Sequence, residues 1–453
     1  MNKVYDLQAR NNLSVIVIAA ITLIAYIVLL FLIPRSNFFT TYSLFVILFF
    51  SYFYIIQNSS LFSLKFCVVL AIGLRLIAVF SLPALSDDYF RFIWDGKMFL
   101  HHINPFTYTP KEYLAINSDT QLQFLYNNLI PESQESFSIY PAILQYVFAA
   151  AAFIFPKNPY GAAVIMKLFI FIAECFTIYG LYLFTNLKKL PARNILWYAL
   201  NPLIIVELTG NVHFEAFLIC FLLFSFYFLE KEKIILPALF WALAINSKLL
   251  PLMLAPLLLM YIGFWRFIKL GLYTAIFMVL TSIPLIDKQL LSHFGNSVGK
   301  YYNLFEFNAS LYYLVTRVSE LFSKEDYTQQ IAAVLGIISF IVILFISFFK
   351  FKKEALLERV LWIFFIYFLF AAMVHPWYIS TMVMLSVFSR YKFPIVFSLL
   401  IPLSYFPYWL KEYDESMYVI LLEYLLLFAY MVYEWKRMRK NKVIVIQMYK
   451  REK

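Results

Sequence analysis

The 453-residue sequence has little of what a soluble enzyme usually carries. Only 14% of its residues are charged, and it contains just 10 glycines and three cysteines. Cys67, Cys175 and Cys220 each lie inside an apolar run, so we expect neither structural disulfides nor cysteine metal sites. The sequence has no Walker loop, no dinucleotide-binding glycine pattern and no HExxH motif. These absences disfavour nucleotide hydrolysis and zinc proteolysis.

Hydrophobic residues dominate instead, at 63% of the chain, with 51 Phe and 34 Tyr. A single soluble core cannot bury that much apolar surface. Repeated apolar runs of about 20 residues are long enough to cross ~30 Å of hydrocarbon. We therefore predict an all-α, polytopic transmembrane protein with about 11 to 14 spans. Nothing in the sequence suggests a linker, so residues 1–453 are expected to form a single membrane domain.

The net charge of +11 is concentrated in short loops and at the C-terminal end. The basic loop residues are Lys188, Lys189, Arg193, Lys231, Lys233, Arg266, Lys269, Lys350, Lys352, Lys353, Arg390 and Lys392, and the tail adds Lys436, Arg437, Arg439, Lys440 and Lys442. The positive-inside rule places these loops and both termini in the cytoplasm. This distribution favours anchoring at the plasma (cytoplasmic) membrane and membrane lipid as a partner, with no nucleic acid bound.

The topology that follows gathers the isolated polar residues on the outer face. The run 13–33 is read as a retained first span, and 138–156 as a re-entrant or interfacial helix pair. The stretch 234–264 is interrupted by "NSK" at 246–248, which predicts two short helices with the break facing outward. Segment 84–137, "GNVHFEA", Lys248, the loop 287–310 and "HPWY" at 375–378 then share the outer face.

The most charged part of the outer face is "SDDYFRFIWDGKMFLHHINPF", residues 86–106. Ser86 or Asp87 can cap a helix that ends near residue 102, and Asp88, Arg91 and Asp95 then share one helix face. One interpretation is structural, with Asp87 as the cap and the other three as a self-satisfied surface ion-pair network. The other is chemical, because adjacent carboxylates suit a general base or a divalent metal site.

Four further ionisable residues stand at the mouths of predicted spans: His213, Glu215, Lys248 and His375. Such groups are costly in a membrane unless they face water or a ligand. The structural alternatives are histidines hydrogen-bonded to a neighbouring helix and a lysine that extends to the outer surface. The chemical alternative for Lys248 is a cation that neutralises a phosphate.

These blocks, in this order, resemble a known family. "SDDYFRFIWDGKMFLHHINPFTYTP" is similar to the outer loop of the polyprenol-phosphate-mannose-dependent mannosyltransferases, integral membrane enzymes of the GT-C fold. Weaker landmarks follow in "IYPAILQ", "NPLIIVELTGNVHFEA", "SKLLPLMLAPLLL", "FEFNASLYYL" and "HPWYI", so that the resemblance spans about 85 to 380. It implies transfer of a sugar, mannose by preference, from a polyprenyl-phosphate donor to a glycan or glycolipid acceptor on the outer face, with Asp88 or Asp87 as catalytic base.

The residue chemistry fits that reaction, because a sugar phosphate needs a base for the acceptor hydroxyl and cations for the departing phosphate. We predict Asp88 as the base, with Arg91, Lys248 and His375 holding the phosphate. We predict that Asp87, Asp95, His213 and Glu215 contact hydroxyl groups of the sugar or the acceptor. Trp94 and Trp377 are predicted to stack on sugar rings. No cofactor is required, although Mg²⁺ or Mn²⁺ at Asp87 and Asp88 is compatible. A transporter or flippase of a lipid-linked saccharide is the competing hypothesis.

Overall fold

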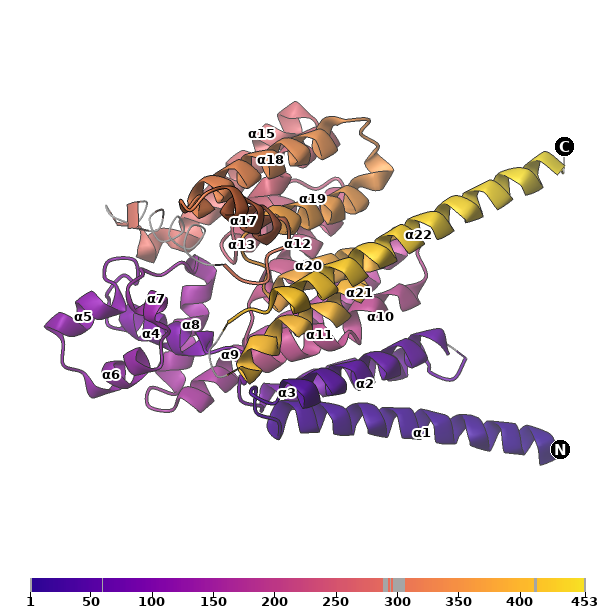
Figure 1. Cartoon of the computed structure of the whole chain (residues 1–453), viewed down its shortest axis with the longest axis horizontal. Helices are drawn as coiled ribbons and strands as arrows, with labels where there is room; N and C mark the ends of the chain where they lie inside the picture. Colours follow the sequence, from indigo (N-terminus) through magenta and orange to yellow (C-terminus); the bar gives the residue numbers. More distant parts are fainter. Residues whose placement is uncertain are drawn as a thin grey trace.

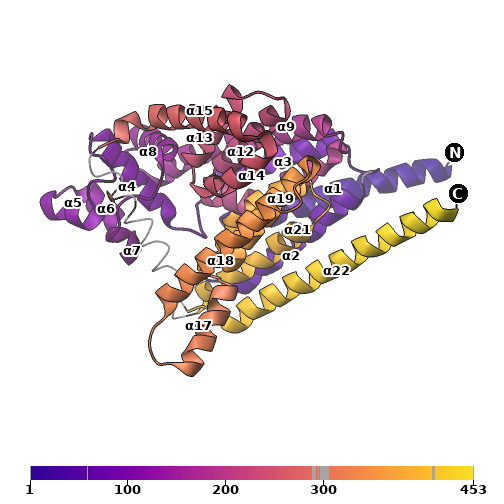
Figure 2. The ribbon, with the colours of Figure 1, turned by 90° about the horizontal axis from the view of Figure 1, so that it is seen from above.

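The computed structural model describes residues 2–58, 60–287, 292–293, 295, 306–410 and 414–451. Most of the 287–310 loop therefore lies outside the described residues. Within them the regular elements are all helices, and the one β-type pairing is an isolated bridge between Phe307 and Met373. The predicted all-α fold class is confirmed. Both chain ends lie at one end of the molecule, and the helices of the 84–137 segment lie at the other (Figures 1 and 2).

Among the described residues, six helices are long and apolar enough to cross a membrane, and one bent pair raises the number to seven. The six are α1 (Asn2–Phe31), α2 (Phe38–Gln57), α9 (Pro159–Leu187), α15 (Phe264–Ser282, apolar through Leu285), α18 (Thr328–Phe348) and α22 (Met417–Arg451). The bent pair joins residues Pro202–Gly210 to α12 (Glu215–Glu230) at an angle of 115°. These helices identify an integral membrane protein.

Fewer long spans are found than the 11 to 14 expected, because several predicted spans are short or built from pieces. They consist of α3 (Leu64–Val79), η1 (Ala192–Ile195), α10 (Leu196–Ala199), α11 (Pro202–Ile204), η2 (Ile205–Gly210), α13 (Ile235–Ile245), η3 (Leu250–Leu254), α14 (Ala255–Ile262), α19 (Leu356–Phe370), η6 (Pro376–Ile379), α20 (Ser380–Ser386), α21 (Phe393–Leu400) and η7 (Ile401–Trp409). Prolines at the starts of α11, η3, α21 and η7 remove backbone donors and divide these runs. The break predicted at 246–248 is confirmed, since α13 ends at Ile245 and η3 begins at Leu250.

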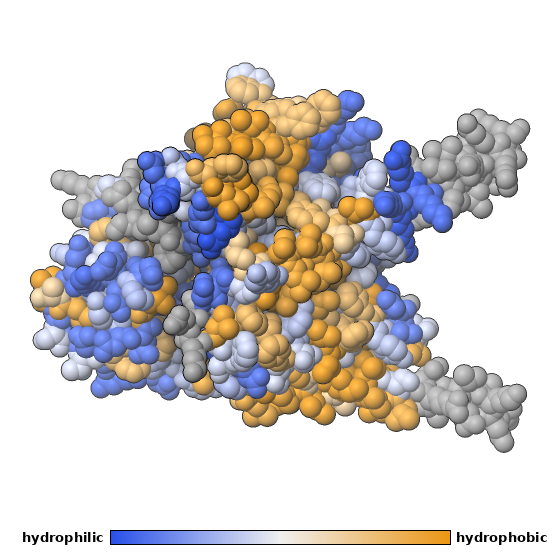
Figure 3. All heavy atoms as spheres, in the orientation of Figure 1, coloured by the Kyte–Doolittle hydropathy of each residue, from blue (hydrophilic) through white to orange (hydrophobic). Residues whose placement is uncertain are grey.

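The long helices present apolar side chains outward. Only 17% of the apolar window of α15 and 22% of that of α18 are buried inside the molecule. Figure 3 shows this surface as hydrophobic across the middle of the molecule, whereas the lobe formed by the 84–137 segment is largely hydrophilic. An apolar band of this extent is the surface that hydrocarbon chains cover in a bilayer.

The hydrophilic lobe contains α4 (Asp88–Leu100), α5 (Pro110–Ile116), α6 (Thr120–Asn127) and α7 (Pro131–Gln134), and α8 (Ala142–Ile154) packs against α4. Helix α4 packs closely on α8 because residue 96 is a glycine. A Cβ there would stand 2.3 Å from the carbonyl oxygen of Phe148, which no other residue could accommodate without moving the helices apart. The α4–α8 packing fixes the start of α4, where Asp88 lies.

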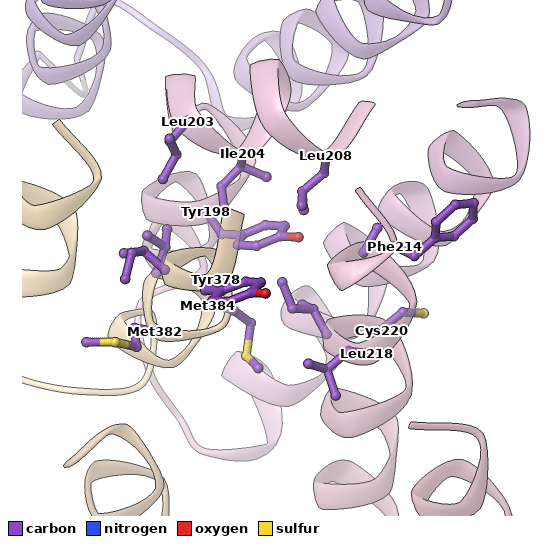
Figure 4. Packing of buried hydrophobic residues seen from close by; sticks show 14 of the residues in the cluster. Tyr198, Leu203, Ile204, Leu208, Phe214, Leu218, Cys220, Tyr378, Met382 and Met384 are labelled. Carbon is purple, nitrogen blue, oxygen red and sulfur yellow. The ribbon is translucent and has the colours of Figure 1, made fainter. Parts of the chain in front are cut away.

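The buried core holds the "HPWY" turn in place. Figure 4 shows Tyr198, Ile204 and Leu208 of the α10–η2 segment facing Tyr378 and Met384 of the η6–α20 segment. Arg75 of α3 pairs with Glu174 of α9 at 2.9 Å, and Tyr198 donates its hydroxyl to the same carboxylate at 2.5 Å. All three side chains are fully buried. Such a pair is strongly destabilising to break, so it ties three helices into one frame.

The connections between helices fall into two groups at opposite ends. The basic loops contact one another through Lys188–Glu230, Arg193–Phe62, Asn194–Val387, Arg266–Glu232, Arg390–Glu358 and Lys392–Glu434. The other end is joined through Arg35–Asp87, Tyr408–Leu85, Asn104–Leu285, Ile143–Asn246 and Phe307–Ala372. The segments predicted to share the outer face therefore share one end of the molecule. Which side of the membrane that end faces stays a prediction.

Candidate active site

Helix α4 begins at Asp88, and of the two predicted caps, Ser86 and Asp87, the structure has Ser86. The side chain of Asp87 stands at the N-cap position without capping the helix. Ser86 Oγ accepts the Asp88 N–H at 3.3 Å, while Asp87 Oδ2 pairs with Arg35 Nη1 at 2.7 Å. The cap is therefore Ser86, because a cation from the α1–α2 connection holds the Asp87 carboxylate.

Two pockets meet at Asp88. The first, called the apolar pocket, has a volume of about 160 Å³ and extends between α8, η3 and α19. The second, called the polar pocket, has a volume of about 520 Å³ and opens beneath the 129–137 segment. Their shared wall consists of Asp88, Ile139, Tyr140, Met373 and Trp377. Asp88 supplies the only carboxylate of this wall among the described residues, so one acid faces both spaces.

Burial raises the pKa of the Asp88 carboxyl above its ordinary value of 3.8. The negative charges of Asp87 and Glu215 raise this pKa further, whereas the positive charge of His213 and a hydrogen bond with Ser86 lower it. A carboxyl group whose pKa is raised but which still ionises is a stronger base than an exposed aspartate. Asp88 therefore has the electrostatic setting of a general base.

Lys248 and Glu215 form the polar corner of the apolar pocket. The Lys248 ammonium pairs with a Glu215 carboxylate oxygen and lies 3.7 Å from the centroid of the Tyr378 ring. Glu215 is the first residue of α12, and Lys248 lies in the break between α13 and η3. The remaining lining is mainly apolar, with Leu249, Leu250, Leu144, Phe368 and Ala371. The pocket thus combines an ammonium group with a mainly apolar wall.

A stack of four rings separates the two pockets. His213 lies 3.6 Å from Trp377 between ring centroids, Trp377 lies 4.4 Å from His375, and His375 lies 4.6 Å from Phe307. Both faces of the Trp377 indole are therefore covered by imidazoles. Stacking on a sugar ring, as predicted for Trp377, needs an open ring face, so this residue acts as a partition instead.

His375 lines the polar pocket and lies apart from Lys248, which lines the apolar one. Burial lowers the pKa of His375 well below its ordinary value of 6.5, and the positive charges of Lys248 and His213 lower it further. A neutral imidazole brings no positive charge to a phosphate. The phosphate-binding role predicted for His375 therefore does not fit its surroundings, whereas contact with an acceptor hydroxyl does.

Arg91 and Asp95 brace the pocket wall. Arg91 Nε pairs with Asp95 Oδ1 at 2.8 Å, and Arg91 Nη1 donates to the carbonyls of Ser133 and Ser136 at 2.8 and 3.0 Å. Asp95 also accepts from Ser138 at 2.5 Å. Asp95 is fully buried and lines neither pocket, so its predicted contact with sugar hydroxyls is replaced by a bracing role.

Arg91 Nη2 is buried without a hydrogen-bond partner among the described residues, and the side chain lines the polar pocket. Its position separates it from Lys248, so the predicted grouping of both cations at one phosphate is not found. Trp94 is also displaced from the site. It is 1% exposed, contacts Tyr113 edge-on and lines neither pocket, because it lies on the face of α4 that packs against α5.

Two residues of this region escaped the sequence reasoning, Arg35 and Glu207. Arg35 is a lone arginine in a connection assigned to the outer side, where basic residues are disfavoured. Glu207 is an acid inside the apolar run "NPLIIVELTG", and an intramembrane ionisable residue is by default a functional candidate. Both signals were present in the sequence.

The residues that the structure describes include no ready-made metal cluster. In the described part of the chain, no three His, Cys, Asp or Glu side chains are grouped as a metal site requires. The Asp87 carboxylate, one of the two predicted metal ligands, is engaged by Arg35. Dependence on a divalent cation stays a prediction to be tested.

Comparison with known families matches the region that contains these residues. Residues 40–263 match the family model described as alpha-(1->6)-mannopyranosyltransferase, N-terminal domain. The match includes Asp88, Glu207, His213, Glu215 and Lys248. No curated protein matches the chain significantly. The matched family consists of GT-C-type mannosyltransferases, which accords with an all-helical membrane protein and supports a mannosyltransferase activity. Over residues 40–263, just under half of its length, the chain is similar to the alpha-(1->6)-mannopyranosyltransferase family.

Proposed function

We propose that the protein transfers mannose from a polyprenyl-phosphate carrier to a hydroxyl group of a glycan or glycolipid acceptor on the non-cytoplasmic face of the membrane. The observation that carries this proposal is the position of Asp88 in the wall shared by two pockets of contrasting lining. A transferase needs two substrates that meet at one base, and this arrangement provides a space for each.

The apolar pocket suits the lipid-linked donor. Lys248 supplies a positive charge for the phosphate, and the apolar lining from Leu249, Leu250 and Phe368 suits the first isoprene units of the carrier. Glu215 keeps the ammonium in place before the donor binds, through the ion pair between them. The outward-facing apolar helices leave the remaining carrier chain to the bilayer.

The polar pocket suits the acceptor sugar. Its walls carry the Arg35–Asp87 ion pair, Glu132 and Glu306, which can exchange hydrogen bonds with sugar hydroxyls. Aromatic rings from Tyr140 and Phe137 add apolar surface of the kind that sugar rings pack against. A volume larger than that of the apolar pocket accommodates an acceptor that extends into water.

The reaction balances with the groups present. Asp88 takes the proton of the acceptor hydroxyl while that oxygen attacks C1 of the mannose. The C1–O bond to the phosphate breaks, its electron pair leaves on the phosphate oxygen, and Lys248 stabilises the added charge. Because acceptor and leaving group approach from the two pockets on either side of the shared wall, we expect inversion at C1. No step requires a metal ion.

The test is transfer of radiolabelled mannose from polyprenyl-phosphate mannose by the purified protein, using a panel of acceptor glycans. We expect the wild type to label an acceptor and Asp88→Asn to lose transfer while remaining folded. Asp119→Asn is the matched control, because Asp119 caps α6 outside both pockets and asparagine caps equally well. Movement of intact donor across vesicles without transfer would instead support the transporter hypothesis.

A further inference from the structure

His213 is presented to the apolar pocket by an unusual backbone. The residues before it, Ile205–Gly210, form a π-helical turn, a form that is rare and frequent at functional sites. Val212 has a φ of 63°, although a β-branched residue is strained in this left-handed region. The His213 N–H closes the turn by donating to the Leu208 carbonyl at 3.1 Å. Strain of this kind persists where the surroundings impose it, often at active sites.

The two ring nitrogens of His213 have different surroundings. Nδ1 lies 3.0 Å from the carbonyl oxygen of Glu207, which can only accept, so Nδ1 carries a proton. Nε2 is buried and has no hydrogen-bond partner among the described residues, while the side chain lines the apolar pocket beside Lys248 and Glu215. Nε2 is therefore the atom of His213 that is left for a ligand in this pocket.

Glu207 lies on the other side of the imidazole. Its side chain is fully buried, and neither carboxylate oxygen has a hydrogen-bond partner among the described residues. The ionisable group that lies closest is the His213 imidazole, whose Nδ1 is 3.5 Å from Oε2. A buried carboxylate without hydrogen bonds is costly unless a cation opposes it. The stacked indole of Trp377 stabilises a cation at the same ring, because its π face is negative.

We propose that Glu207 is a positioning residue that holds His213 as an imidazolium, so that Nε2–H donates a hydrogen bond to the phosphate of the lipid-linked donor. This inference rests on the proposed function, because it takes the donor phosphate to occupy the apolar pocket. His213 and Lys248 then approach the phosphate from two sides of that pocket. His213 thus contacts the leaving group, and Glu207 acts through His213 alone.

The test measures binding of polyprenyl phosphate and of uncharged polyprenol to the purified protein in detergent. The variants are Glu207→Gln, His213→Gln and the double variant, because glutamine keeps the shape of each side chain and removes the charge. We expect Glu207→Gln to weaken polyprenyl phosphate binding about tenfold, since the ionic part of such a hydrogen bond contributes about half of its strength. On the His213→Gln background the same change has no further effect. Polyprenol binding is unchanged throughout.

Glu174→Gln is the matched control, because Glu174 is equally buried but pairs with Arg75 away from both pockets. It lowers the melting temperature without changing the ratio of phosphate to polyprenol affinity. The inference is overturned if Glu207→Gln binds polyprenyl phosphate like the wild type, or loses affinity equally with and without His213. Equal affinity of the wild type for polyprenol and polyprenyl phosphate would instead overturn the donor assignment, and this inference with it.

Discussion

Replacing Lys248 with methionine removes the ammonium that we place at the donor phosphate while keeping the aliphatic part of the side chain. The Lys248 side chain is 29% exposed and already faces the Glu215 carboxylate. A unit charge about 4 Å from a phosphate oxygen contributes about 4 kcal/mol at an effective dielectric constant near 20. The Lys248 ammonium also interacts with Glu215, which reduces the net stabilisation that it gives the phosphate. We therefore use the lower end of the range measured for the loss of a single oxyanion donor, about 3 kcal/mol. We therefore expect kcat to fall about 100-fold.

The assay is the steady-state rate of mannose transfer from radiolabelled polyprenyl-phosphate mannose. Lys248→Met leaves the Glu215 carboxylate unpaired, which can destabilise the fold. The double variant Lys248→Met, Glu215→Gln removes that charge too, so it should regain stability but not the rate. Lys97→Met is the matched control, because Lys97 is a buried lysine outside both pockets. A double variant that is folded and has a kcat within threefold of the wild type would refute the role of Lys248.

Three further predictions follow from single features of the site. Because burial raises the pKa of Asp88 and the base must be ionised, the acid limb of the pH–rate profile has its midpoint above 3.8, and a midpoint at or below 3.8 contradicts the role of Asp88. Asp95→Ala leaves the positive charge of Arg91 buried without its carboxylate partner, so the free energy of unfolding measured by SDS titration falls by about 3–5 kcal/mol. An unchanged unfolding midpoint would contradict the bracing role of Asp95. Arg35→Ala raises the KM for the acceptor by no more than about fivefold with little change in kcat, because the Arg35–Asp87 pair is partly exposed and contributes at most about 1 kcal/mol. A change in the KM for the donor alone would refute the assignment of the polar pocket to the acceptor.

The fold was largely predictable because the signals that define it are local. Apolar runs of span length mark the long helices, and "NSK" followed by Pro251 marks the break between α13 and η3. The start of α4 also follows from Ser86, one of the two predicted caps, whose hydroxyl accepts the Asp88 N–H. The number of long spans was overestimated because hydropathy does not reveal where a buried apolar run is divided into short helices, as it is between Ile195 and Gly210.

The sequence indicated which ionisable residues lie in the site but not how they are arranged. Asp88, His213, Glu215 and Lys248 do converge on one pocket, since each is an ionisable group at the same end of an apolar chain. Trp94 was misplaced, because the sequence of α4 does not reveal that the Trp94 ring packs against Tyr113, a residue of another helix.

The stacked rings and the ion pair of Asp87 could not be predicted, because they join residues far apart in the sequence. Trp377 lies more than 160 positions from His213, its stacking partner, and Arg35 meets Asp87 across two helices. No local pattern encodes such contacts. They follow from the packing of η6 against η2 and of the α1–α2 connection against α4.

The central claim is that Asp88 accepts the proton of the acceptor hydroxyl, and the rate of mannose transfer by Asp88→Asn tests it most directly. Asparagine keeps the size of the side chain and removes its basicity, so transfer should fall by at least about 100-fold. Binding of polyprenyl phosphate should stay within about twofold of the wild type, because Lys248 and the apolar lining are untouched. A folded Asp88→Asn protein that transfers mannose at the wild-type rate would contradict the account.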